Sequence, residues 1–191
     1  MAAKPNPTLD IVYIALFAAL TAALALFPPL TLPVIGVPIT AQSMGPMLAG
    51  AILGARRGAL AMVLVIALVA IGLPILSGGR GGLGVFAGPT VGFLLGWVPA
   101  AWVTGLLHEL GWRQLTSISS FTHAAVGGIV VLYAIGIPVL AFQAGLTLKA
   151  AAVGSMTFIP GDLIKAALTA MIAVSVKRAW PIIRPAAEPS A

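Results

Sequence analysis

The sequence contains no cysteine and very few charged side chains. Of its 191 residues, 60% are hydrophobic and 7% are charged, and only 4 are acidic. The lack of cysteine excludes disulfides, thiolate chemistry and cysteine-based metal sites. Because a soluble domain has about 25% charged residues, this chain lacks the side chains for a polar surface, and we expect membrane lipid to surround it.

The lysine and arginine residues give a formal net charge of +6 but do not predict a nucleic-acid partner. They are scattered at the ends of apolar segments and form no basic stripe with interleaved aromatic rings. The chain also lacks the Gly-Lys-Ser/Thr motif of a phosphate-binding loop, which argues against an ATPase of its own.

The apolar segments predict an all-α, multi-pass membrane protein. The length allows about six helices of roughly 20 residues with short loops. We expect one compact domain at residues 11–180, between a cytoplasmic segment at 1–10 and a disordered cytoplasmic tail at 181–191. Pro99 should kink the fourth helix and Pro138 should interrupt the fifth. The six helices are predicted at residues 11–27, 42–54, 59–73, 89–107, 121–142 and 160–177.

The first apolar segment, residues 11–27, allows two interpretations. Residues 23–25 (ALA) resemble a signal-peptide cleavage site, but the segment is long for a signal peptide and one lysine precedes it, which favours a membrane helix. A face of small residues runs along it, which allows close helix packing in lipid, either within this protein or against a partner. That face consists of Ala15, Ala18, Ala19, Ala22 and Ala23.

Two connections have unusual compositions. Residues 28–40 contain four prolines and cannot form one helix. Apolar irregular backbone at membrane depth is tolerated only where protein buries it or where it lines a cavity. Residues 78–90, between the third and fourth helices, are rich in glycine and contain one charge, Arg80. They form either a loop that is closely approached or a flexible linker with a solvated arginine.

The remaining connections have more ordinary compositions. We expect a tight turn at residues 56–58, a polar connection at 108–120 and a weaker segment at 143–157. His108 falls in the polar connection and His123 at the inner end of the fifth helix. Because no triad or metal-ligand spacing accompanies them, we interpret both as structural or interfacial.

The last apolar segment contains two charges, Asp162 and Lys165. Pro160 suits a helix start, where its missing N–H would have had no partner, and a carboxylate in the first turn suits the helix dipole. Lys165 lies three residues after Asp162, so the two share a face. Because a charge at the centre of a membrane helix costs roughly 2.5–3.5 kcal/mol, such residues usually mark a site or pathway. The alternative is an ion pair that only neutralises itself.

The distribution of lysine and arginine predicts the orientation in the membrane. With six helices both termini lie on one side, and by the positive-inside rule that side is cytoplasmic. Trp112 and Trp180 fit an inner interfacial belt. The proline-rich connection, the glycine-rich loop and the Asp162–Lys165 face therefore meet at the outer side of the cytoplasmic membrane. The basic residues of the inner side are Lys4, Arg56, Arg57, Arg113, Lys177, Arg178 and Arg184.

The charges at the outer side suit a ligand with a carboxylate and a separate N–H group. Arg80 or Lys165 would bind the carboxylate, and Asp162 would accept from the N–H group. No second carboxylate lies in the outer half to pair with Asp162, so we predict no catalytic residues and no metal site. Apolar walls for an uncharged ligand body could come from Phe86, Phe93 and Phe158.

Three stretches carry a family resemblance when taken together. They are residues 37–45 (VPITAQSMG), 78–90 (GGRGGLGVFAGPT) and 158–165 (FIPGDLIK). Together they resemble the BioY family, the biotin-binding S-components of energy-coupling-factor transporters. The resemblance extends from the first helix to about Lys177, and residues 158–165 are its most specific part.

The resemblance implies a six-helix fold with a substrate pocket near the outer face and no cofactor. It implies that Asp162 binds the ureido ring of biotin and that Lys165 binds the valerate carboxylate. It also makes Gln42 and Gly79 substrate-binding candidates beside Arg80, Phe86 and Phe93. Finally, it implies that the first helix packs through Ala15 and Ala19 on a transmembrane coupling protein, which connects to two cytosolic ATPases.

This sequence departs from the family pattern at two positions. Some members have asparagine at the position of Arg80 and arginine at the position of Leu94. We hypothesise that Arg80 takes over part of the carboxylate binding beside Lys165. The glycine-rich loop would close over biotin, and the coupling complex would turn the protein to release biotin inward.

Two other functions remain open from the sequence. An intramembrane enzyme that uses Asp162 would turn over a lipid or peptide and need a second essential acid or base. A channel or a structural membrane subunit would show no saturable ligand binding.

Overall fold

The computed structural model of the chain describes residues 6–27, 30–31 and 38–183. Most of the proline-rich connection and the predicted disordered tail lie outside these residues. Within them, two short strands, β1 (Leu30–Thr31) and β2 (Pro38–Ile39), pair antiparallel, and the rest is helix and connecting loop. The α-helices are α1 (Pro7–Ala23), α2 (Met44–Leu53), α3 (Ala55–Ala70), α4 (Val91–Leu110), α5 (Ser117–Ala125), α6 (Leu132–Ala144), α7 (Leu148–Ser155) and α8 (Ile159–Ala179).

The described helices form six continuous helical rods, which we name columns: α1, α2, α3, α4, α5 with α6, and α7 with α8. The sequence predicts this number. A π-helical segment, η5 (Val126–Val131), joins α5 to α6, and a short 3₁₀ segment, η6 (Met156–Phe158), joins α7 to α8. Four columns are long and apolar enough to cross a membrane, and α2 and α3 are the two shorter ones. The four long spans are Pro7–Leu26, Val91–Leu110, Ser117–Ala144 and Leu148–Ala179.

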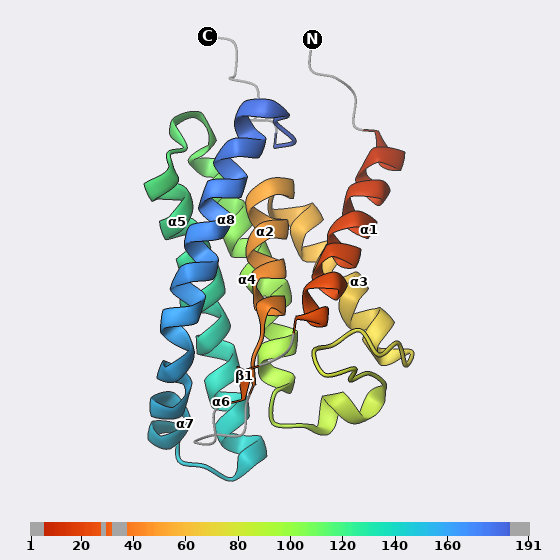
Figure 1. The fold of residues 1–191 in the computed structure, drawn as a ribbon, viewed down its shortest axis with the longest axis vertical. Helices are drawn as coiled ribbons and strands as arrows, with labels where there is room; N and C mark the ends of the chain where they lie inside the picture. Colours follow the sequence, from red (N-terminus) through yellow and green to blue (C-terminus); the bar gives the residue numbers. More distant parts are fainter. Residues whose placement is uncertain (1–5, 28–29, 32–37, 184–191) are drawn as a thin grey trace.

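Figure 1 shows that the bundle has two distinct ends. The start of α1 and the end of α8 lie together at one end, which we name the terminal end. At the opposite end, the loop end, lie β1, α7 and the glycine-rich connection between α3 and α4. An ion pair between Arg57 and Asp10, 2.7 Å long, joins α3 to α1 at the terminal end.

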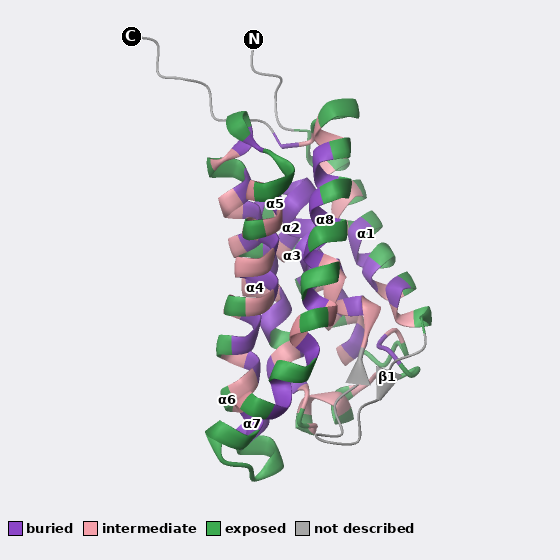
Figure 2. Cartoon of the chain, turned by 60° about the vertical axis from the view of Figure 1, so that its left-hand side comes forward, coloured by how far each residue is buried: buried purple, intermediate pink, exposed green. Residues whose placement is uncertain are grey.

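Buried residues fill the centre of the bundle, and exposed residues cover its outside (Figure 2). Every residue of α2 from Gly45 to Leu53 is buried, and α2 packs against α3, α4 and α8. Many exposed side chains on the outer helices are large and apolar, including Ile11, Leu16 and Ile164. Since no polar layer covers them, the surface suits lipid, and the chain is a multi-pass membrane protein.

Glycine permits the closest helix contacts. A Cβ at Gly50 of α2 would overlap the carbonyl oxygen of Ala101 in α4, and a Cβ at Gly105 of α4 would overlap the backbone at Ala55. Small residues let helix backbones approach in this way within a membrane. At Gly54, between α2 and α3, φ is +87°, and the Glu109 carboxylate accepts a hydrogen bond of 2.8 Å from the next backbone N–H.

Several predicted boundaries are wrong. The turn between the second and third helices is at Gly54, so residues 56–58 belong to the first turn of α3. The fourth helix begins at Val91 and continues past His108 to Leu110. A capping box at Thr116 starts α5 at Ser117. Both changes make the polar connection shorter than predicted. The weaker segment at 143–157 is mostly helical, since the Thr147 side chain caps α7.

The predicted interruption at Pro138 is also wrong. Pro138 lies inside α6 and is exposed, and the helix continues through it. Membrane helices tolerate proline where neighbouring groups satisfy the freed backbone. The irregular turn is instead at η5, where a Cβ at Gly127 would overlap the Thr104 hydroxyl of α4.

The small-residue face of α1 divides between two environments. Ala18 is buried against the bundle and Ala22 is partly buried, whereas Ala15, Ala19 and Ala23 are exposed. Internal packing is therefore confirmed for Ala18, and contact with a partner stays a prediction for the exposed alanines. Ala18 packs internally, and Ala15 and Ala19 are on a surface that a partner could contact.

Candidate functional site

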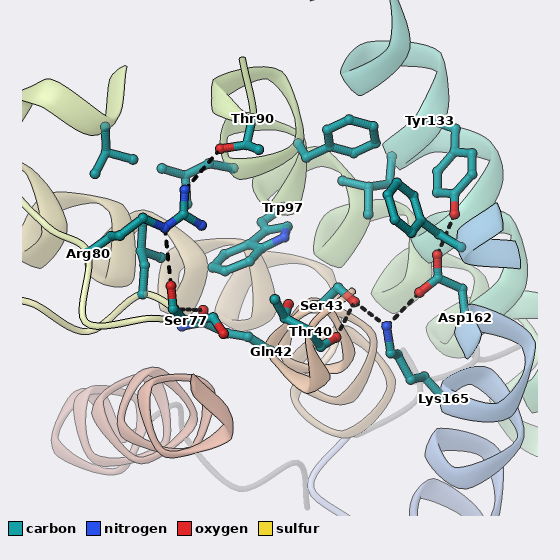
Figure 3. A pocket seen from close by; sticks show the side chains of 16 residues that line it. Thr40, Gln42, Ser43, Ser77, Arg80, Thr90, Trp97, Tyr133, Asp162 and Lys165 are labelled. Carbon is teal, nitrogen blue, oxygen red and sulfur yellow. Dashed lines mark hydrogen bonds and ion pairs between the residues drawn. The ribbon is translucent and has the colours of Figure 1, made fainter. Parts of the chain in front are cut away.

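A cavity at the loop end is lined by segments from distant parts of the chain (Figure 3). Its free volume is about 100 Å³. Small-molecule pockets usually measure about 300–1,000 Å³, so a ligand of vitamin size would need some lining side chains to move apart. The lining residues are Thr40, Gln42, Ser43, Leu76, Ser77, Arg80, Val85, Thr90, Phe93, Leu94, Trp97, Leu132, Tyr133, Phe158, Asp162 and Lys165.

Asp162 is the centre of a hydrogen-bonded group at one side of this cavity. Its Oδ1 accepts from Lys165 Nζ at 2.8 Å, and its Oδ2 accepts from the Tyr133 hydroxyl at 2.5 Å. The Lys165 ammonium also donates to Ser43 Oγ at 2.8 Å. The side chains of Asp162 and Lys165 are 5% and 12% exposed, so both charges are withdrawn from lipid and water.

The local sequence explains how α8 presents this pair. Pro160 is in the first turn of α8, and Asp162 follows in the same turn, as predicted. The spacing of three residues brings Lys165 onto the face of Asp162, and the predicted ion pair is present. It both neutralises itself and lines a cavity, so the two interpretations of the pair do not exclude each other.

Tyr133 and Ser43 are brought to Asp162 by packing rather than by local sequence. Tyr133 follows the π-helical segment η5, whose wider turn changes the direction of the side chains after it. Ser43 immediately precedes α2. Neither residue belongs to the predicted site, and an aromatic hydroxyl inside an otherwise apolar helix was the signal that could have identified Tyr133.

Gln42 fixes the beginning of the glycine-rich connection. Its side-chain amide donates to the carbonyl of Ile75 at 2.8 Å and accepts from the N–H of Ser77 at 3.0 Å. Gln42 is 2% exposed. The predicted candidate Gln42 therefore lines the cavity and also holds the backbone of the loop from the side of α2.

The glycine-rich connection is a structured turn rather than a flexible linker. Leu76 and Arg80 exchange two backbone hydrogen bonds of 3.0 and 3.2 Å. Between them Gly78 and Gly79 have φ of +80° and +70°, a backbone conformation that residues other than glycine rarely adopt. The chain then continues into a short helical segment, η3 (Leu83–Ala87).

Arg80 lies at the opposite side of the cavity from Asp162 in Figure 3, with Trp97 between them. Its guanidinium donates to the carbonyl of Ser77 at 3.1 Å and to the Thr90 hydroxyl at 3.5 Å. No carboxylate of the described residues forms an ion pair with Arg80. Its charge is therefore available to an anionic group in the cavity.

Aromatic and aliphatic side chains form the middle of the cavity. Phe93 packs edge to face on Tyr133, with ring centroids 5.9 Å apart, and Trp97 and Phe158 are buried beside the lining. Phe93 and Phe158 are thus part of the wall, as predicted. Gly79 and Phe86 are not among the lining residues, and Val85 occupies the wall near Phe86.

The two histidines lie away from this cavity. The His108 ring forms hydrogen bonds with the carbonyl of Thr104 and the hydroxyl of Ser120, both 2.8 Å long, and stacks edge to face with His123. These contacts join α4 to α5 and agree with a structural role. Among the described residues, no group of three or more histidine, aspartate or glutamate side chains is arranged to bind a metal ion.

The cavity thus has two polar sides and an apolar middle. One side offers a carboxylate with a neighbouring ammonium and hydroxyl, and the other offers a guanidinium that no carboxylate of the described residues neutralises. Such a site matches an elongated ligand with a neutral hydrogen-bonding head, an apolar body and an anionic tail.

Known proteins match this chain over nearly its whole length. The profile described as the BioY family matches residues 1–182. The biotin transporter BioY of Rhizobium etli is 56% identical over 181 residues, 92% of this chain and 97% of that protein. The biotin transporter BioY of Rhodobacter capsulatus is 49% identical over 183 residues, 90% of this chain and 95% of that protein.

The fold also matches a solved structure. The crystal structure of the S-component for biotin from an ECF-type ABC transporter superposes with a TM-score of 0.86. It is 30% identical in sequence, and the match covers 92% of this chain and 95% of that chain.

Proposed function

The chain belongs to the BioY family, and from this we propose that it binds biotin and takes it up as the S-component of an ECF-type ABC transporter. The cavity with Asp162 and Arg80 on opposite sides is the observation that carries this proposal. It matches the ureido ring, the apolar body and the carboxylate of biotin. On this proposal the chain is a transport subunit and not an enzyme.

Asp162 accepts a hydrogen bond from one ureido N–H group in the proposed complex. Lys165, which is bonded to Asp162 and Ser43, lies on that same side and donates to the ureido oxygen. Arg80 on the other side then binds the valerate carboxylate. This arrangement revises the assignment from the resemblance, which gave the carboxylate to Lys165.

A charge-pair experiment tests the assignment of Asp162 and Lys165. Lys165→Met leaves a buried carboxylate without its cation, which should destabilise the protein by about 3–5 kcal/mol. The double variant Asp162→Asn/Lys165→Met removes both charges and should restore thermal stability, yet it should bind no radiolabelled biotin. The control is Asp10→Asn/Arg57→Met, the ion pair at the terminal end, which should leave biotin binding unchanged.

The same binding assay separates this function from its rivals. An enzyme using Asp162 would consume a lipid or peptide, and a structural subunit or channel would show no saturable biotin binding by the purified wild-type protein. Absence of saturable binding in the wild type would overturn the proposal. If the double variant still bound biotin, Asp162 and Lys165 would not belong to the binding site.

The proposed transport cycle needs the loop to move. The cavity is smaller than typical ligand pockets, so we propose that the glycine-rich connection opens to admit biotin from the outer side and closes over it. A spin label at the exposed position 83 should lose mobility when biotin binds. A label at position 118, which is exposed at the terminal end, should not change.

The proposed partners are a transmembrane coupling protein and two cytosolic ATPases. The exposed alanines Ala15 and Ala19 of α1 would contact the coupling protein, and the complex would turn this chain in the cytoplasmic membrane to release biotin inward. Both termini would lie in the cytoplasm, since most of the described basic residues outside the cavity are at the terminal end: Arg56, Arg57, Arg113, Lys177 and Arg178.

A further inference from the structure

Ser77 has a buried hydroxyl without a hydrogen-bond partner. The residue is 2% exposed, and its Oγ forms no hydrogen bond with any of the described residues. Three other buried polar atoms share this property: Thr104 Oγ1, His123 Nδ1 and Thr169 Oγ1. Of these four residues, Ser77 is the one that lines the cavity.

An unpartnered hydroxyl is unfavourable for the protein alone. Buried polar groups are nearly always hydrogen-bonded, and each exception needs an explanation such as a bound water or ligand. Alanine in place of serine would remove the desolvation cost of the hydroxyl without losing a hydrogen bond within the protein. A role in ligand binding explains why a hydroxyl is nevertheless present at this position.

The backbone of Ser77 is held on both sides. Its N–H donates to the Gln42 side chain at 3.0 Å, and its carbonyl accepts from the Arg80 guanidinium at 3.1 Å. Figure 3 shows Ser77 beside Gln42 and Arg80, on the side of the cavity away from Asp162. The backbone that carries the Ser77 side chain is therefore held next to the proposed carboxylate-binding arginine.

We propose that the Ser77 hydroxyl donates a hydrogen bond to the carboxylate of the bound ligand and that Gln42 positions Ser77 for this contact. This inference rests on the proposed function, because it takes biotin as the ligand. Arg80 supplies charge, and Ser77 supplies a short neutral donor, so the pair distinguishes a free carboxylate from its ester. A carboxylate accepts such bonds more strongly than a neutral ester oxygen.

The variant Ser77→Ala tests the contact by comparing two ligands and the stability of the protein. Its affinity for biotin should fall about tenfold or more, as expected for a lost hydrogen bond to a charged group. Its affinity for biotin methyl ester should change less than threefold. Its melting temperature without ligand should stay the same or rise, because no bond within the protein is lost.

Thr169→Val is the matched control, since it removes a buried, unpartnered hydroxyl in α8 that does not line the cavity. It should leave both affinities unchanged. Gln42→Leu removes the hydrogen bond that holds the Ser77 backbone. It should weaken the binding of biotin more than the binding of biotin methyl ester, because both ligands keep their contacts with Asp162.

Each other result contradicts the inference in an identifiable way. If Ser77→Ala lowered the affinity for biotin and for its ester equally, the hydroxyl would not contact the carboxylate. If the melting temperature of Ser77→Ala also fell, Ser77 would have a structural role. If the affinity for biotin did not change, the hydroxyl would not bind the ligand and would be hydrated instead. Failure of the wild-type protein to bind biotin would instead overturn the proposed function.

Discussion

At the scale of single residues, Asp162 shows how a buried carboxylate is stabilised inside an apolar bundle. A charge-neutralising lysine comes from its own helix, and a tyrosine hydroxyl comes from α6. Hydrogen bonds to a charged group are stronger than those between neutral groups. Because both carboxylate oxygens are engaged, the orientation of Asp162 toward the cavity is fixed.

Tyr133→Phe should weaken biotin binding about tenfold, because it removes a hydrogen bond to a charged group, worth about 1.5 kcal/mol, and leaves Asp162 less well oriented. Equilibrium binding of radiolabelled biotin to the purified protein measures this. The chain has two tyrosines, and Tyr13→Phe on α1 is the control with unchanged affinity. If both variants bind as the wild type does, the Tyr133 hydroxyl does not orient the site.

At the scale of helices, the crossing of α2 and α4 depends on the absence of side chains. Gly50 and Gly105 bring the two backbones into contact, and the resulting close packing replaces the hydrophobic driving force that lipid cannot supply. Since α2 begins just after Gln42 and Ser43, this crossing also determines where those residues lie relative to α8.

Gly105→Ala should destabilise the protein by at least about 1–3 kcal/mol, the usual cost of overpacking, because its Cβ would overlap the backbone at Ala55. Thermal unfolding in detergent measures the loss. Gly84→Ala in η3 is the control, since nothing lies within 4 Å of its added Cβ. Equal melting temperatures for the two variants would show that the crossing can adjust.

The exposed alanines of α1 make a second prediction at this scale. Ala15→Leu/Ala19→Leu should abolish biotin uptake by cells that contain the proposed coupling protein and ATPases, while purified protein binds biotin as the wild type does. The bulkier side chains keep the partner helix at a distance. Ala134→Leu, at an exposed alanine of α6 on the other side of the bundle (Figure 1), is the control. Normal uptake by the double variant would place the coupling surface elsewhere.

At the scale of the whole molecule, the cavity with its two cations, Arg80 and Lys165, lies at the opposite end from a second group of basic residues. Arg57 and Lys177 are at the terminal end, where Lys177 donates to the carbonyl of Trp112. The cavity with Asp162 and Arg80 is at the loop end. A protein inserted by the positive-inside rule would therefore open its cavity to the outside.

Single cysteines test this orientation without background, because the chain has none. In intact cells a membrane-impermeant maleimide should label Leu83→Cys in η3. It should label Gln114→Cys, between α4 and α5, only after the cells are permeabilised. The reverse pattern would mean that the cavity faces the cytoplasm and that the proposed direction of uptake is wrong.

Composition and local spacing were enough to predict part of this architecture. The apolar segments required a membrane bundle, six columns followed from length, and the spacing of Asp162 and Lys165 produced an ion pair because residues three apart share a helix face. The glycine-rich connection is recognisable from its composition, and the segment at Gln42 from the family resemblance, but neither feature predicts their contact.

Which of these residues contact one another depends on how the helices pack. The bond from Tyr133 to Asp162 joins residues 29 apart, and that from Gln42 to Ile75 joins residues 33 apart. Packing also separated Arg80 from Lys165, divided the alanines of α1 and left the Ser77 hydroxyl without a partner among the described residues. The physical reason is that helix geometry repeats locally and can be read from spacing, whereas the contacts between helices depend on how closely particular backbones approach, as at Gly50 and Gly105.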